Sequence, residues 1–335
     1  MQQLRKPYLL YLGDARLPTD CKTALGLRDW SPEAVLGEWS HRDGRISLGL
    51  PRLSPGEAAA RGAGSLVIGV APTGGQLPEH WHDDLEAALS AGLDVVSGLH
   101  TRLDSAPRLR RAAQRRGVRL IDVRHPSRAY PVASGRRRRG QRVLTVGTDC
   151  ALGKKYTALA LTRGLVARGV AATFRATGQT GILIAGTGIA VDAVVVDFVA
   201  GAAEALSPDN EAGHWDVIEG QGSLYHPAYA AVTLGLLHGS QPDAIVLCHD
   251  PTRTTIEEYP DYPIPALAVV IDAYLRAGRL TNAGIRCVGL SINSSALSEP
   301  DWRAYRLRLE RELALPVCDP LRGGVEALVS ALCPG

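Results

Sequence analysis

The chain contains, near its middle, the stretch Arg142-Val-Leu-Thr-Val-Gly147-Thr148-Asp149-Cys150-Ala-Leu-Gly153-Lys154-Lys155-Tyr-Thr157. Residues 143–146 are apolar and rich in β-branched side chains, which predicts a buried strand. After Gly153 the apolar residues recur at helical spacing. A strand, a glycine-flanked turn, a Gly-Lys pair and a helix are together typical of a phosphate-binding loop. In such a loop, backbone N–H groups, the helix dipole and a lysine converge on an anion.

This loop departs from the usual pattern at two positions. Five residues separate Gly147 from Gly153, and Lys155 occupies the position at which a Ser or Thr normally binds magnesium. Thr157 could replace that hydroxyl only with a different loop geometry. An anion site is therefore predicted more firmly than ATP hydrolysis, although an ordinary glycine-rich turn with a solvated lysine pair also fits the sequence. The residues expected to bind a cofactor are Gly147, Thr148, Asp149, Cys150, Gly153, Lys154, Lys155 and Thr157.

The composition is typical of a soluble globular protein large enough for two domains. Of the 335 residues, 45% are apolar and 21% are charged. Basic residues outnumber acidic ones by only three (37 against 34), which does not indicate a nucleic-acid or membrane partner. Lysine occurs at only four positions, so a lysine pair within one loop is less plausible as an incidental feature.

The six cysteines are scattered, without the short paired spacings of metal-binding or disulfide-rich sequences. We therefore expect neither a disulfide framework nor a bound metal. No uninterrupted apolar run approaches membrane-spanning length. These features predict a cytoplasmic protein.

Strands and helices alternate in the N-terminal part, which predicts a parallel sheet and a Rossmann-like domain over residues 1–138. Residues 8–12 read as a possible strand, but the rest of the first ~60 residues show only weak periodicity. Clearer strands are predicted at 66–71, 94–97 and 118–123, and helices at 79–91 and 107–116. Ligands of such sheets lie beyond the carboxyl ends of the strands. The pocket candidates there, each of which also fits a solvated turn, are Thr73, Gly74, Gly75, His100 and His125.

The second domain is predicted to span residues 139–335, with a doubly wound, P-loop NTPase-like fold. A glycine-flanked arginine run, residues 135–140, precedes it and is interpreted as a solvated linker. Helical spacing favours a helix over 191–206, although Val194-Val-Val196 could equally be a strand. The remaining elements are predicted as strands at 170–176, 215–219, 243–248, 286–292 and 316–318, and as helices at 264–277, 301–313 and 324–332.

Polar segments follow several of these predicted strands, where a parallel sheet would place its ligands. Glu219 ends a short strand among glycines and could hold a metal or a substrate ammonium group, although a turn or capping acid also fits. Asp197, after three valines, could mimic the magnesium-binding acid of a nucleotidase. The residues expected to line a substrate site are Arg175, Thr177, Gly178, Gln179, Thr180, Gln221, Ser223, Asp250 and Arg253.

The loop Gly147-Thr-Asp-Cys-x-x-Gly153-Lys154 resembles that of dethiobiotin synthetase and its P-loop relatives. Over the whole chain, the sequence resembles the DgcN-type D-glutamate N-acetyltransferase family, formerly a domain of unknown function. The stretches that carry this resemblance are Asp20-Cys-Lys-Thr23, Gly147 to Thr157, Thr177-Gly-Gln-Thr-Gly181, Asp192 to Glu204, Glu219-Gly-Gln-Gly-Ser-Leu224 and His249-Asp-Pro-Thr-Arg253. Together they span both predicted domains, which makes the combination far more specific than the loop alone.

The resemblance implies acetyl transfer from acetyl-CoA to the amino group of D-glutamate, a small-molecule substrate, with the product passing to an enolase-superfamily partner. Amide formation from a thioester requires a base for the amine, for which Glu219 is preferred over Asp197 and His249. Backbone N–H groups within 178–181 or 220–223 could stabilise the oxyanion. Arg175 or Arg253 could bind a substrate carboxylate, since the guanidinium fork accommodates carboxylates.

Two other functions fit the motifs. An ATP/Mg-dependent ligase or kinase of the dethiobiotin synthetase type would use Lys154, Thr157 and a magnesium ion on Glu219, but Lys155 is then unexplained. A nucleotide-binding regulatory module would use the loop alone. The apolar predicted helix at 264–277 could serve a subunit interface, and we expect a homo-oligomer.

Overall fold

The structure, a computed structural model, describes residues 4–70, 72–125 and 129–333. The chain forms two compact units. Unit 1 comprises Met1–Ser127 and Gly178–Ala193, and unit 2 comprises Arg128–Thr177 and Val194–Gly335. This division differs from the predicted boundary between residues 138 and 139. It also assigns to unit 1 a segment from the middle of the predicted second domain.

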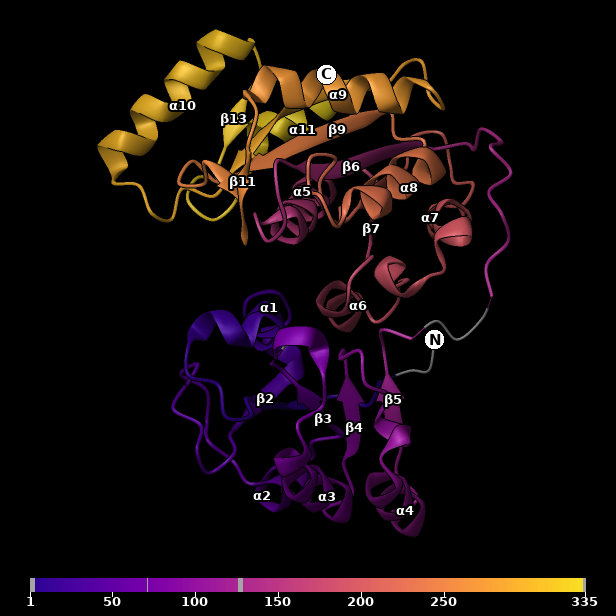
Figure 1. Cartoon of the computed structure of the whole chain (residues 1–335), viewed down its shortest axis with the longest axis vertical. Helices are drawn as coiled ribbons and strands as arrows, with labels where there is room; N and C mark the ends of the chain where they lie inside the picture. Colours follow the sequence, from indigo (N-terminus) through magenta and orange to yellow (C-terminus); the bar gives the residue numbers. More distant parts are fainter. Residues whose placement is uncertain (1–3, 71, 126–128, 334–335) are drawn as a thin grey trace. The chain divides into compact units, whose positions relative to one another are not determined.

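Unit 1 is built on a five-stranded parallel sheet with the order β2-β1-β3-β4-β5 (Figure 1). Its strands are β1 (Tyr8–Tyr11), β2 (Val35–Trp39), β3 (Ser65–Ile68), β4 (Asp94–Ser97) and β5 (Leu120–Asp122). Strands β1, β3 and β4 are buried at every residue, as expected for a parallel sheet covered on both faces. The order is that of flavodoxin-like sheets and confirms the Rossmann-like prediction.

Strand β2 was not predicted, because Gly37 and Glu38 interrupt its apolar residues. The Glu38 carboxylate is nevertheless buried. It accepts hydrogen bonds from Ser47 Oγ (2.5 Å) and from the Leu48 N–H (2.7 Å). These bonds satisfy a charge that the sequence pattern reads as exposed.

The helices of unit 1 include one from the later part of the chain. They are α1 (Lys22–Trp30), α2 (Pro55–Ala60), α3 (His82–Ser90), α4 (Pro107–Arg116) and α6 (Gln179–Ala185). Helix α6 packs against α1, where the hydroxyls of Thr23 and Thr180 lie 3.0 Å apart in a buried hydrogen bond. Short 3-10 helices are η1 (Pro18–Cys21), η2 (Pro32–Ala34), η3 (Thr73–Gly75), η4 (Glu79–Trp81), η5 (Leu103–Ser105) and η6 (Val191–Ala193).

Unit 2 is built on a six-stranded parallel sheet with the order β13-β12-β9-β6-β8-β7 (Figure 1). Its strands are β6 (Gln141–Gly147), β7 (Ala172–Arg175), β8 (Trp215–Ile218), β9 (Ala244–His249), β12 (Arg286–Ile292) and β13 (Val317–Cys318). Strands β7 and β8 lie on one side of β6, and β9 and β12 lie on the other. The carboxyl end of β6 is therefore the topological switch point, where such sheets bind ligands.

Helices pack on this sheet in two groups, as in a doubly wound fold. They are α5 (Lys154–Ala167), α7 (Val199–Leu206), α8 (Ala230–Ser240), α9 (Leu267–Arg279), α10 (Glu299–Leu313) and α11 (Glu326–Leu332). Helices α5 and α11 pack together, whereas α8 packs with α7 and α9. An antiparallel hairpin of β10 (Thr255–Ile256) and β11 (Tyr259–Pro263) completes the unit.

The helix predicted over 191–206 is shorter in the structure. It consists of the 3-10 helices η6 and η7 (Val196–Phe198), followed by α7 from Val199. Three consecutive β-branched residues, Val194 to Val196, weaken the first half as a helix. Asp197 consequently lies in the exposed turn η7 rather than on a helix or strand.

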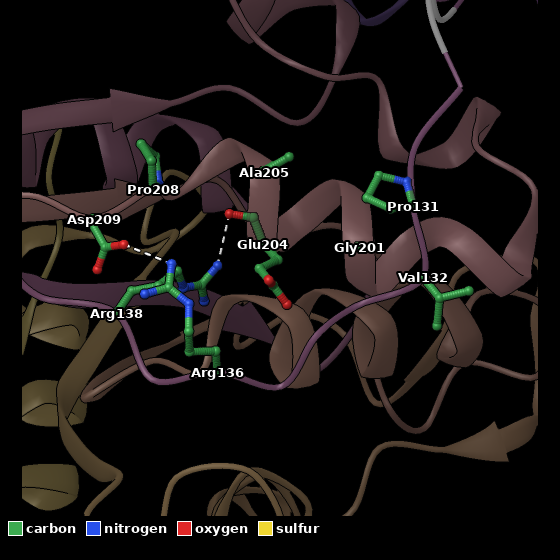
Figure 2. Close-up of a pocket in the computed structure, with 9 residues that line it drawn as sticks. All are labelled: Pro131, Val132, Arg136, Arg138, Gly201, Glu204, Ala205, Pro208 and Asp209. Atoms are coloured by element: carbon green, nitrogen blue, oxygen red, sulfur yellow. Dashed lines mark hydrogen bonds and ion pairs between the residues drawn. The ribbon is translucent and has the colours of Figure 1, made fainter.

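The arginine run is exposed at Arg136, Arg137 and Arg139, as expected for a solvated linker, but it is buried at Arg138. Arg138 is only 7% exposed and donates to the carbonyl oxygens of Glu204, Gly239 and Ser240. Figure 2 shows the run crossing α7, with Arg136 paired to Asp209 at 2.8 Å. Buried carbonyl groups at helix ends thus hold the run against unit 2, an interaction that a charge pattern does not reveal.

Candidate functional site

The glycine-flanked loop follows β6 at the switch point of unit 2. Gly153 has φ +99°, a conformation that favours glycine, and α5 begins at the next residue. Among the described residues, the N–H groups of Ala151, Leu152, Gly153 and Lys154 have no hydrogen-bond partner. Four consecutive free donors at the start of a 14-residue helix form a cradle for an anion.

Lys154 lies inside this cradle. Its Nζ is buried and donates to the carbonyl oxygen of Asp149 at 2.6 Å, and burial lowers its pKa. Its side chain passes close to Gly220, where a Cβ would lie 3.1 Å from Lys154 Cδ and 1.7 Å from the Thr145 carbonyl oxygen. The loop lysine and the segment that carries Glu219 are therefore neighbours, and no side chain fits between them.

Asp149 connects the loop to the β10–β11 hairpin. The carboxylate is fully buried and accepts from Arg253 Nη1 (2.7 Å) and from the Glu257 N–H (2.9 Å). The same guanidinium donates to the Cys150 carbonyl oxygen at 2.8 Å. Arg253, which the sequence analysis assigns to the substrate site, lies at the loop, where its partners are protein groups.

Glu219 is buried at the carboxyl end of β8. Its Oε2 accepts from the Thr177 N–H at 2.8 Å, and its carbonyl oxygen accepts from Thr177 Oγ1 at 2.7 Å. Gln221 Nε2 donates to the same hydroxyl at 3.1 Å. Three of the predicted site residues are thus joined in one network that links the ends of β7 and β8.

His249 also lies beside the loop. Its Nδ1 is 2.9 Å from Thr148 Oγ1, and burial lowers its pKa to about 4. The imidazole is consequently neutral at pH 7. Asp250 accepts from the N–H and hydroxyl of Thr252 and from Asn293 Nδ2 (3.0 Å), so it shapes the following turn.

Other predicted residues have different surroundings. Arg175 forms an ion pair with the buried Asp216 at 2.7 Å. Thr157 is buried on α5, where its hydroxyl donates to the Gly153 carbonyl oxygen and lies 2.8 Å from Ser291 Oγ. Thr157 therefore packs between helix and sheet, which leaves the loop without a hydroxyl at the magnesium position.

The predicted segment after β7 divides between the units. Thr177 belongs to unit 2, whereas Gly178 begins the part assigned to unit 1. In unit 1, Gln179 Oε1 accepts from the buried guanidinium of Arg124, which also pairs with Asp192.

The carboxyl ends of the unit 1 strands place several predicted residues near Arg124. Its Nη1 is 3.3 Å from His100 Nε2, and its Nε donates to the Gly98 carbonyl oxygen at 2.8 Å. The His100 N–H donates to the Gly75 carbonyl oxygen. His125 Nε2 is buried without a partner among the described residues. Arg124 itself was not predicted, although its place directly after a strand was an available signal.

His226 is the residue at the loop that the sequence did not indicate. It is 3% exposed, and one of its ring nitrogens lies within 4.8 Å of both an Asp149 oxygen and Cys150 Sγ. Its Nδ1 accepts from the Ala228 N–H at 3.1 Å. No motif marks this position; the only signal was its closeness in sequence to the glycine segment after β8.

Aspartate, cysteine and histidine are potential metal ligands, but their contacts here argue against a cation. Both oxygens of Asp149 already accept hydrogen bonds: Oδ1 from the Cys150 N–H, and Oδ2 from the Arg253 guanidinium and the Glu257 N–H. The His226 Nδ1 lone pair is occupied by an N–H group. Lys154 adds positive charge, and burial raises the pKa of the Cys150 thiol. The donor set suits an anion better than a metal.

Comparison with known proteins supports the division into a Rossmann-like and a P-loop part. Residues 37–126 match the family model described as "Domain of unknown function (DUF1611_N) Rossmann-like domain". Residues 131–329 match "Domain of unknown function (DUF1611_C) P-loop domain". A crystal structure of a DUF1611 family protein from Anabaena variabilis superposes with a TM-score of 0.89 at 36% identity, covering 98% of this chain and 100% of that one.

Two curated relatives match along nearly their whole length. The protein from Tritonibacter scottomollicae is 48% identical over 329 residues, which cover 98% of this chain and 99% of the relative. The protein from a Pseudoalteromonas species is 45% identical over 331 residues, covering 99% and 100%. Both are named D-glutamate N-acetyltransferase. No described helix is long and apolar enough to cross a membrane.

Proposed function

This chain belongs to the DUF1611 family, and on that premise we propose that it acetylates the amino group of D-glutamate with acetyl-CoA as the donor. The observation that carries the proposal is the name shared by the two relatives, each matched over at least 99% of its own length. The chain is thus an N-acetyltransferase that acts on a small molecule.

The loop suits a phosphate group of CoA. Four free N–H donors and Lys154 converge at the start of α5, and CoA carries a pyrophosphate and a ribose phosphate. ATP with magnesium fits less well, since Lys155 replaces the metal-binding hydroxyl and Thr157 is engaged with Ser291.

The closeness of Glu219 to Lys154 restricts the roles available to each. The phosphates and the thioester lie at opposite ends of the pantetheine arm, so an extended CoA whose phosphate occupies the loop keeps its acetyl group away from Glu219. His249, bonded to Thr148 of the loop, is subject to the same restriction. With the phosphate in the loop, Glu219 and His249 shape the cofactor end of the site, and Glu219 is no longer preferred as the base.

A thiol-release assay tests the function directly. The enzyme is incubated with acetyl-CoA and either D-glutamate, L-glutamate or another D-amino acid, without ATP or magnesium. We expect thiol release that requires D-glutamate, with N-acetyl-D-glutamate identified by mass spectrometry. Absence of thiol release, together with ATP consumption in the presence of D-glutamate and magnesium, would favour the ligase or kinase.

A further inference from the structure

Aromatic side chains extend outward from the loop through His226. The His226 ring lies 4.5 Å from that of Tyr229 and 5.2 Å from that of Tyr259, between ring centroids. Tyr262 continues the series, with its ring 6.0 Å from that of Tyr259. Together these four residues form a wall that begins at the anion cradle, and we call it the aromatic wall.

The aromatic wall is held in place by the loop itself. Tyr259 and Tyr262 lie on β11, and the chain just before this strand is bound to Asp149 through Arg253 and Glu257. A cavity of about 290 Å³ lies along the hairpin, lined by residues 252–260. This volume is close to the lower end of the range for small-molecule sites. An exposed hairpin is thus fixed relative to the cradle by a partly buried ion pair.

His226 presents a donor toward this site. Because Nδ1 accepts from the Ala228 N–H, the neutral ring carries its proton on Nε2. Nε2 has no hydrogen-bond partner among the described residues, although the side chain is only 3% exposed. Burial lowers the pKa of His226, and the charge of Lys154 lowers it further, whereas the charges of Asp149 and Glu258 raise it. A neutral imidazole N–H beside Lys154 completes an anion site without adding another charge.

Two tyrosines of the wall are exposed although they are large and partly apolar. Tyr229 is 53% exposed and Tyr262 is 48% exposed. Aromatic rings beside a phosphate cradle are the recognition elements for a nucleotide, because every base can stack on them.

We propose that the aromatic wall is the nucleotide subsite for CoA: His226 donates to a phosphate held in the loop, and the exposed tyrosines stack against the adenine. This proposal rests on the proposed function for the identity of the ligand. It assigns the hairpin and His226 to the cofactor rather than to the amino acid.

Titration calorimetry with adenosine 3′,5′-bisphosphate, the nucleotide end of CoA without its thioester, tests the subsite. The variants are Tyr229→Leu and Tyr262→Leu, which alter exposed residues, and Leu280→Ala, at the exposed apolar residue that follows α9, is the control. Since one base stack contributes enough to change affinity by about 5- to 150-fold, we expect at least a five-fold weaker Kd for the nucleotide in the first two variants. Pyrophosphate should bind all three variants as it binds the wild type.

His226→Phe keeps an aromatic ring but removes the N–H donor, so it should weaken the binding of both the nucleotide and pyrophosphate. Thermal unfolding of the variant shows whether it is folded. Nucleotide affinity unchanged in Tyr229→Leu and Tyr262→Leu would overturn the proposal. The proposed function can fail independently of the subsite. If the wild type binds the nucleotide in this tyrosine-dependent manner but releases no thiol with D-glutamate, the subsite proposal stands and the proposed function is wrong.

Discussion

Replacing Lys154 with glutamine tests the phosphate role of the loop most sharply among single substitutions. The Nζ group is buried inside the cradle and, within the part of the chain that the structure describes, donates only to the Asp149 carbonyl oxygen of its own loop, so a bound phosphate gains a charge-assisted hydrogen bond. Hydrogen bonds to charged groups contribute roughly 1.5–3 kcal/mol, which corresponds to about a 10- to 150-fold increase in the Kd for acetyl-CoA.

The assay is calorimetric titration of acetyl-CoA into wild type, Lys154→Gln and two matched lysine variants. Lys22 is an exposed lysine of α1 in unit 1, so Lys22→Gln should bind as the wild type does. Lys155→Gln, in which the second loop lysine is changed, should have a smaller effect because that side chain is half-buried at the rim. A Lys154→Gln protein that unfolds like the wild type and binds acetyl-CoA within two-fold of it would refute the phosphate role.

Three further substitutions test the surroundings of the loop. Gly220→Ala places a Cβ 1.7 Å from the Thr145 carbonyl oxygen and should lower the free energy of unfolding by about 3 kcal/mol or more. Gly213→Ala is the control, because a Cβ at Gly213 meets open space and should not lower it. Equal urea midpoints for the two variants would contradict this packing. The pKa of His249, about 4, lies below its value in the unfolded chain, so the unfolded state binds more protons and stability is lost as pH falls from about 6.5 to 4. This loss of stability, up to ~3 kcal/mol, should not occur in the His249→Gln variant. If the unfolding free energies of wild type and variant changed in parallel with pH, His249 would not be the cause. Arg175→Met removes the guanidinium partner of the buried Asp216 carboxylate, which then keeps the neutral Asn210 amide as a donor, and should cost up to about 3 kcal/mol of stability without changing the KM for D-glutamate. A selective rise in that KM would return Arg175 to the substrate site.

The parts of the fold with strong local signals were predictable. The strand β12 matches its prediction at both ends, and β6 with the following loop and helix was predicted because β-branched residues, glycines and helical spacing act locally. Strand β2 was missed because a buried glutamate, satisfied by bonds from nine and ten residues away, reads as a surface residue.

The sequence predicts which segments lie together at the site, but it does not predict the hydrogen-bond and ion-pair partners of the individual residues. Parallel strands bring Glu219, His249 and the loop to one edge, which follows from the strand pattern alone. Whether Arg253 faces a ligand or Asp149 depends on a contact across 104 residues of sequence. His226 lies outside every motif, so only the tertiary fold brings it to the loop.

The most direct test of the account is a crystal structure of the enzyme with CoA bound. We predict a phosphate group of CoA within hydrogen-bond distance of the N–H groups of residues 151–154 and of Lys154 Nζ, with the adenine against Tyr229 or Tyr262. A structure with the CoA sulfur at the loop and the phosphates elsewhere would contradict it, and would return Glu219 to consideration as the base.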